Sequence, residues 1–177
     1  MDAFEKIVDL YSRIRAENAE PRERPPATIF SVKLAFEGLG LKLPMLLEKI
    51  YTWHNGIFDL NAFLHFPSLR ESVNTYRALA DLRLRGSEPE TKASWFPVLD
   101  LNGDILYCLD VENGEIWAVD IECGTAWLLA RSYERYIDAL RAAFDRECAV
   151  YDPHSGEFDI SDGDWAALCR EFCLESI

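Results

Sequence analysis

Apolar residues recur every three or four positions over much of the chain, a spacing typical of amphipathic helices. Capping residues set the expected ends. Thr28 precedes one apolar stretch and Gly40 follows it, Pro44 suits the first turn of the next, and Ser132 precedes a later one. The sequence predicts helices at Asp2–Asn18, from the cap Thr28 to Leu39, at Met45–Trp53, Ser68–Leu84 and Tyr133–Arg146, and from Asp162 or Asp164 to near Cys173.

From Trp95 onward the apolar period changes from about 3.6 to 2, which indicates β-strands. Asn102-Gly103, Asn113-Gly114 and Cys123-Gly124 separate four short runs, and Asn-Gly favours a hairpin because both residues tolerate positive φ. We predict a four-stranded antiparallel meander, and a short earlier strand at Phe63–Phe66. The meander strands are expected at Phe96–Leu101, Ile105–Val111, Glu115–Ile121 and Thr125–Ala130.

The order of these elements, helices followed by a meander and then further helices, predicts one α+β domain over residues 1–177. Hydrophobic residues make up 49% of the chain and charged residues 28%, an ordinary globular balance. No apolar run approaches the roughly 20 residues that a membrane-spanning helix needs. The N-terminal residues also show no signal-peptide core. We therefore expect a cytoplasmic protein without a membrane partner.

The five cysteines are odd in number, irregularly spaced and free of any CxxC motif, which disfavours a disulfide framework or a zinc ribbon. We expect reduced, mostly packed thiols. Cys169 and Cys173 lie four residues apart and would share a helix face, where packing is favoured over half a metal site. No Gly-rich phosphate-binding loop is present. The sequence therefore predicts neither a metal nor a cofactor.

The net charge of −13 comes entirely from the last part of the chain. Phe96–Ile177 contains 18 acidic and 5 basic residues, whereas acidic and basic residues balance in the rest. Within it, Phe96–Gly124 carries seven carboxylates, and Glu147–Asp164 carries six, without a single Lys or Arg. Such a field repels nucleic acids and anionic membranes and attracts a basic partner. Simple solubility is the alternative explanation.

Two motifs can be interpreted either as chemical sites or as purely structural features. Asp100-Leu-Asn102-Gly-Asp104 alternates oxygen ligands as a calcium loop does, but its glycine is fourth instead of sixth, and a hairpin turn explains the same residues. His54 could serve a hydrolase as a base. We favour a role at the end of a helix, where the helix dipole stabilises a protonated imidazole and Gly56 provides a left-handed cap. No G-x-S-x-G motif marks a nucleophilic serine.

Several short motifs, in their order and spacing, resemble the SUKH superfamily, which includes SMI/KNR-type cell-wall regulators and many bacterial immunity proteins. The resemblance covers roughly Ala27 to Phe144. The motifs that carry it are Leu43-Pro44 before a helix that ends at Trp53-His54-Asn55-Gly56, Trp95-Phe96-Pro97 at the first meander strand, Asn102-Gly103-Asp104 at its turn, Leu109-Asp110 in the next strand, and Ser132-Tyr133 at the following helix.

This resemblance implies helices packed on a twisted antiparallel sheet, and a protein-binding module without catalytic residues. It implies in particular an immunity protein that neutralises a toxin, such as a nuclease, and the acidic half of the chain would suit a basic toxin domain. An intracellular regulator or scaffold is the main alternative. A small-ligand binder with a groove between helices and sheet, and a hydrolase that uses His54, remain further alternatives.

We expect the partner to contact the carboxylates of the meander. Because only alternate residues of a strand share a face, about half of them should point the same way. The predicted contact residues are Asp100, Asp104, Asp110, Glu112, Glu115, Asp120 and Glu122.

Overall fold

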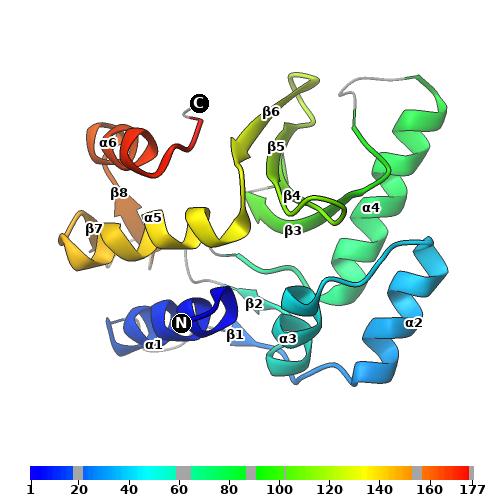
Figure 1. Ribbon diagram of the computed structural model, residues 1–177, viewed down its shortest axis with the longest axis horizontal. Coiled ribbons are helices and arrows are strands. Elements are labelled where there is room, and N and C mark those ends of the chain that lie inside the picture. The colour runs from blue at the N-terminus through cyan, green and yellow to red at the C-terminus, as the bar shows by residue number, and fades with distance from the viewer. Residues whose placement is uncertain (18–21, 59–64, 87–90, 102, 153–156, 176–177) are drawn as a thin grey trace.

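The structure is a computed structural model that describes residues 1–17, 22–58, 65–86, 91–101, 103–152 and 157–175 (Figure 1). Its helices are α1 (Ala3–Glu17), α2 (Ile29–Leu39), α3 (Met45–Trp53), α4 (Leu69–Leu84), α5 (Tyr133–Asp145) and α6 (Asp162–Phe172). Among the described residues, no helix combines the length and the apolar character needed to cross a membrane.

The described strands form three antiparallel sheets. The largest sheet has the order β3-β4-β5-β6, which is the predicted meander, and the whole is an α+β fold. The strands are β1 (Arg22–Glu23) paired with β2 (Ile57–Phe58), the meander strands β3 (Trp95–Leu101), β4 (Ile105–Asp110), β5 (Ile116–Asp120) and β6 (Thr125–Ala130), and β7 (Ala149–Asp152) paired with β8 (Glu157–Ile160).

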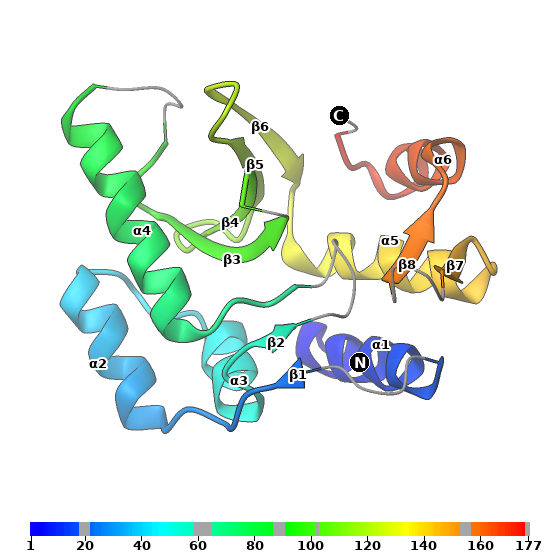
Figure 2. The ribbon, with the colours of Figure 1, turned by 180° about the vertical axis from the view of Figure 1, so that it is seen from behind.

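The meander is buried on both faces. Tyr107 and Ala118 point into the large core, which α1, α2, α3 and α5 share. Their chain neighbours Cys108 and Val119 point the opposite way, into a smaller cluster with Leu79 of α4. Helix α4 runs along the β3 side of the sheet, and α5 crosses beside β6 (Figures 1 and 2). Because α4 covers its face of the sheet only in part, the meander meets solvent at its turns and over part of that face.

The predicted caps are present at most helix ends. The Thr28 hydroxyl accepts a hydrogen bond from the Ser31 backbone N–H at 3.1 Å, and Gly40 ends the same helix with φ of 69°. Ser132 caps α5 in the same way, at 3.3 Å from the Arg135 N–H. Pro44 differs from the prediction, because it occupies the extended N-cap position of α3 and not its first turn.

Ion pairs join the first helix to the helix that follows the meander. The Lys6 ammonium of α1 lies 2.8 Å from carboxylate oxygens of both Asp138 and Glu134 on α5. The hydrogen bonds that Lys6 donates to Asp138 and then to Glu134 raise its pKa above the ordinary value of 10.5. Arg141 of α5 pairs with Asp9 of α1 at 3.1 Å. The contacts fix two segments that are far apart in the sequence.

Two strand pairs were not predicted. The hairpin β7–β8 lies where only a connection between helices was expected, although buried Phe158 and Ile160 flank exposed Asp159 in strand alternation. The pair β1–β2 is only two residues long, too short for a period to show. Of the predicted strand Phe63–Phe66, residues 63 and 64 lie outside the described residues, and Phe66 forms a single bridge with Ile57.

Candidate functional site: the turns of the meander and the adjacent pocket

The meander divides the predicted contact carboxylates between its two ends. The turns β3–β4 and β5–β6 lie at one end, where the Ile121 N–H donates to the Asp104 carbonyl at 2.9 Å. The turn β4–β5 lies at the opposite end. We call the first the acidic end, defined by four residues: Asp100, Asp104, Asp120 and Glu122. The other three, Asp110, Glu112 and Glu115, belong to the opposite end.

At the acidic end, two carboxylates hold the turns and two extend outward. Asp100 accepts a hydrogen bond from the Gly103 N–H at 2.8 Å, and Asp120 accepts one from the Cys123 N–H at 2.7 Å. These contacts are those of hairpin turns, as the sequence favoured over a calcium loop. Asp104 and Glu122 are exposed. None of the four carboxylates pairs with a Lys or Arg of the described residues, so their charge is not neutralised there.

At the opposite end, the structure removes one predicted contact residue. Asp110 is only 2% exposed, and its carboxylate accepts a hydrogen bond from the Glu112 N–H at 3.1 Å. A partner could not reach it in this conformation. The Glu115 carboxylate is mostly covered and binds within the protein, to the Trp117 indole N–H at 3.2 Å and to Arg131 at 3.6 Å. Only Glu112 is freely exposed at this end.

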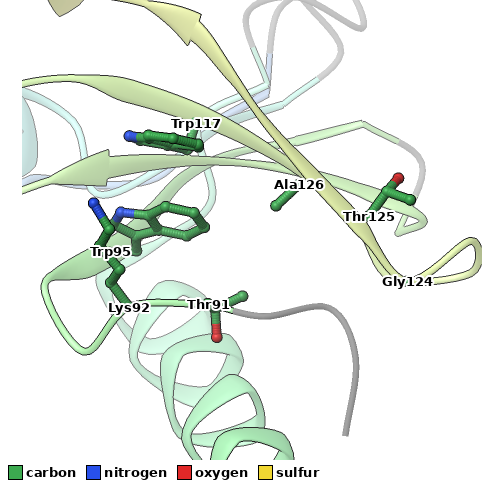
Figure 3. Close-up of a pocket in the computed structure, with 7 residues that line it drawn as sticks. All are labelled: Thr91, Lys92, Trp95, Trp117, Gly124, Thr125 and Ala126. Atoms are coloured by element: carbon green, nitrogen blue, oxygen red, sulfur yellow. The ribbon is translucent and has the colours of Figure 1, made fainter.

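A pocket of about 680 Å³ opens beside the acidic end, on the face of the sheet that α4 covers only in part (Figure 3). Trp95 and Trp117 form one wall, with ring centroids 4.6 Å apart and nearly parallel planes. The residues after the β5–β6 turn form the opposite wall. The described lining residues are Thr91, Lys92, Trp95, Trp117, Gly124, Thr125 and Ala126.

The pocket combines an aromatic wall with a positive charge. The Lys92 ammonium lies 5.7 Å from the ring centroid of Trp95 and 5.2 Å from that of Trp117, within cation–π range. Arg83 of α4 approaches the same loop and donates to the Lys92 carbonyl at 3.1 Å. The indole nitrogen of Trp95 is buried without a hydrogen-bond partner among the described residues. An unpaired buried donor costs free energy.

His54 lies just outside the helix that the sequence assigned to it. Helix α3 ends at Trp53, and His54 is its extended C-cap with φ of −140°, so it is not a residue of the last turn. The imidazole packs against Trp53 with ring centroids 4.5 Å apart, and is 18% exposed. Gly56 has a φ of 106°, in the positive region that only glycine adopts readily.

The carboxylate nearest to His54 is already engaged. Its Nδ1 lies 3.8 Å from Glu23, which also accepts a hydrogen bond from the Tyr11 hydroxyl and pairs with Arg15 at 3.2 Å. The adjacent Asn55 accepts a hydrogen bond from the Leu69 N–H at 2.9 Å, at the first turn of α4. The segment thus connects the end of one helix to the beginning of another.

The thiols are less uniformly packed than predicted. Cys108 and Cys169 are buried, but Cys123 and Cys173 are exposed and Cys148 is partly exposed. Cys173 follows α6 in the left-handed conformation, with φ of 54°, so it does not share a helix face with Cys169. Over the part of the chain that the structure describes, no three His, Cys, Asp or Glu side chains gather as a metal site would require.

No protein-family model matches the chain, and no curated protein matches it either. The resemblance to the SUKH superfamily therefore remains a prediction.

Proposed function

We propose that this protein is a non-catalytic, cytoplasmic protein-binding domain whose acidic end contacts a basic partner. The observation that supports the proposal is the exposed pair Asp104 and Glu122, held together by adjacent turns and left without a cationic partner among the described residues. Elsewhere, carboxylates such as Asp138 and Glu171 are paired with cations of the same chain. A charge left free at one end produces a field that steers a positively charged partner.

The SUKH resemblance makes the proposal more specific. It implies an immunity protein whose partner is a toxin, for example a nuclease with a basic cleft. Two carboxylates on adjacent turns could occupy positions that nucleic acid phosphates take in such a cleft. An intracellular regulator or scaffold would use the same acidic end, and the genes beside this one would separate the two: a toxin-delivery cassette favours immunity.

Charge reversal tests the acidic end. A partner would first be captured with the full chain and identified by mass spectrometry. Its association with the wild type would then be compared with its association with Asp104→Lys/Glu122→Lys. Glu112→Lys is the matched control from the opposite end. We expect the double variant to slow association at least about ten-fold at low salt and to reduce its salt dependence. The control should bind as the wild type does. Unchanged affinity of the double variant would refute the proposal.

The pocket beside the paired tryptophans supports a second candidate function, the binding of a small ligand. Its volume of about 680 Å³ falls within the usual range of ligand sites, and the Lys92 ammonium, exposed beside the paired indoles, could bind an acceptor. A thermal-shift screen of small planar anions tests it. A hit should lose its shift in Lys92→Ala. A shift that persists in this variant would place the ligand elsewhere.

A further inference from the structure

Part of the outer face of α2 is apolar and uncovered. Val32 and Phe36 point into the core, as expected for an amphipathic helix. On the outer side, however, Phe30 is 71% exposed and Leu34 is 56% exposed. Residues four apart lie one above the other on the same helix face. A helix that only covers a core carries polar residues at such positions, so folding of this chain alone does not explain the pair.

These residues border a groove of about 660 Å³ between α2 and α4, which lie side by side (Figures 1 and 2). Leu69 and Val73 of α4 line it from the other side. Gly38 lines it at the end of α2, and a Cβ there would meet no atom within 4 Å. No neighbour inside the protein thus requires a glycine at this position. A glycine in a helix does, however, allow another backbone to approach closely.

The same groove carries two positive charges. Arg70 and Arg77 of α4 line it, seven residues apart, which corresponds to about two helical turns and roughly 10 Å. Neither arginine forms an ion pair with a carboxylate of the described residues, although the chain contains 31 Asp and Glu. Arg24, by comparison, pairs with Glu71 of the same helix at 2.8 Å. Two free guanidinium groups next to exposed apolar side chains fit a ligand that is both apolar and acidic.

We infer that the α2–α4 groove docks an amphipathic helix of a partner protein. The partner helix places apolar residues, spaced three or four apart, against Phe30 and Leu34. Its carboxylates, about seven residues apart, pair with Arg70 and Arg77, because guanidinium groups bind carboxylates with two hydrogen bonds. This surface is separate from the acidic end and has the opposite charge. The inference is therefore independent of the proposed function, and either one can fail without the other.

Selection from a helical peptide library tests the inference with the full chain. The library fixes three leucines at helical spacing and varies the flanking positions among Glu, Lys, Gln and Ser. We expect enrichment of peptides with glutamates about seven residues apart. Fluorescence anisotropy then measures the affinity of an enriched peptide, and Arg70→Glu/Arg77→Glu should lower that affinity at least about ten-fold. The same variant should bind more tightly to a version of the peptide in which lysines replace the glutamates. Leu34→Ser should lower the affinity for the glutamate peptide and for the lysine peptide alike.

Controls come from the end of α4, outside the groove. Leu84 is 86% exposed and Arg85 is exposed, so Leu84→Ser and Arg85→Glu change the same side-chain types where no contact is inferred. Both should bind as the wild type does, and so should Asp104→Lys/Glu122→Lys. The inference is overturned if no peptide is enriched, or if peptides with and without glutamates are enriched equally. It is also overturned if Arg70→Glu/Arg77→Glu still prefers the glutamate peptide to the lysine peptide. It is equally overturned if the groove variants abolish self-association, because the occupant would then be a second copy.

Discussion

The indole of Trp95 lies stacked on the indole of Trp117, with ring centroids 4.6 Å apart and 24° between the planes. The two residues come from β3 and β5, which are not neighbours, because β4 lies between them. The stack therefore bridges β4 above Cys108, a buried residue of the smaller core cluster. It closes that cluster and forms the wall of the adjacent pocket.

Truncation of Trp95, the buried tryptophan of this stack, should destabilise the protein. We expect Trp95→Ala to lower the free energy of unfolding by about 3–5 kcal/mol, the usual cost of truncating a buried tryptophan. Urea unfolding followed by circular dichroism measures it. Trp95→Phe should cost less, because it keeps a ring and loses an N–H that has no partner among the described residues. Equal losses for the two variants would contradict this account.

The capping box at the beginning of α4 predicts a smaller effect. The Ser68 hydroxyl accepts a hydrogen bond from the Glu71 N–H, and the Glu71 carboxylate accepts one from the Ser68 N–H at 2.8 Å. We expect Ser68→Ala to lower the free energy of unfolding by about 1 kcal/mol. Ser12→Ala serves as control, since that exposed hydroxyl donates only within its own helix. A control variant as unstable as Ser68→Ala would remove the capping explanation.

The same cap should make stability depend on pH. Burial favours the neutral form of Glu71, but hydrogen bonds from Ser68 and Arg24 outweigh it and hold the pKa below its ordinary value of 4.5. A carboxyl group with a lowered folded pKa contributes stability above its unfolded pKa, and this is lost as pH falls through the folded value. The stability difference between wild type and Glu71→Gln should therefore stay constant down to about pH 4.5 and shrink below it.

Unfolding curves of both proteins between about pH 7 and pH 3 would show this convergence. Ser68→Ala should weaken it, because the carboxylate loses a donor that lowers its pKa. A difference that grows on acidification would mean that the pKa of Glu71 is raised in the folded state, contrary to the structure.

Alkylation of the native protein should distinguish the thiols by burial and by local charge. Burial raises the pKa of Cys108 to about 12, so this thiol should not react in the folded state. Cys123 is exposed, but a hydrogen bond and the negative charge of Asp120 raise its pKa. Asp120→Asn should therefore speed iodoacetamide labelling of Cys123 near neutral pH. Exposed Cys173 is the internal control, and mass spectrometry of peptides gives both rates.

Local signals were sufficient for most of the fold. Helix Met45–Trp53 and strand Thr125–Ala130 begin and end where the sequence placed them, because apolar period and turn residues act over a few positions. The hairpin β7–β8 was missed for a physical reason. Its strands are four residues each, and six carboxylates in Glu147–Asp164 mask the alternation around Phe158 and Ile160.

The candidate site was predictable only in part. Counting carboxylates pointed to the meander turns, but could not show that Asp110 is buried or that Glu115 binds Trp117 and Arg131. Nothing in the sequence pattern revealed the pocket beside the paired tryptophans, because Trp95 and Trp117 meet only through the pairing of their strands with β4. Phe30 and Leu34 stand in the sequence among the polar residues Ser31, Lys33 and Glu37 of α2, but only the structure shows that no neighbouring element covers them.

The sequence by itself determined most of the elements, most of their caps and the excess of negative charge after Trp95, because these depend on neighbouring residues. Only the tertiary structure decided which charges are free. Strand register brings Asp104 next to Ile121 and separates both from Glu112. Helix packing places Arg70 and Arg77 in the same groove as Phe30, where neither pairs with a carboxylate of the described residues. Pairing and exposure depend on residues distant in the chain, and no local pattern encodes them.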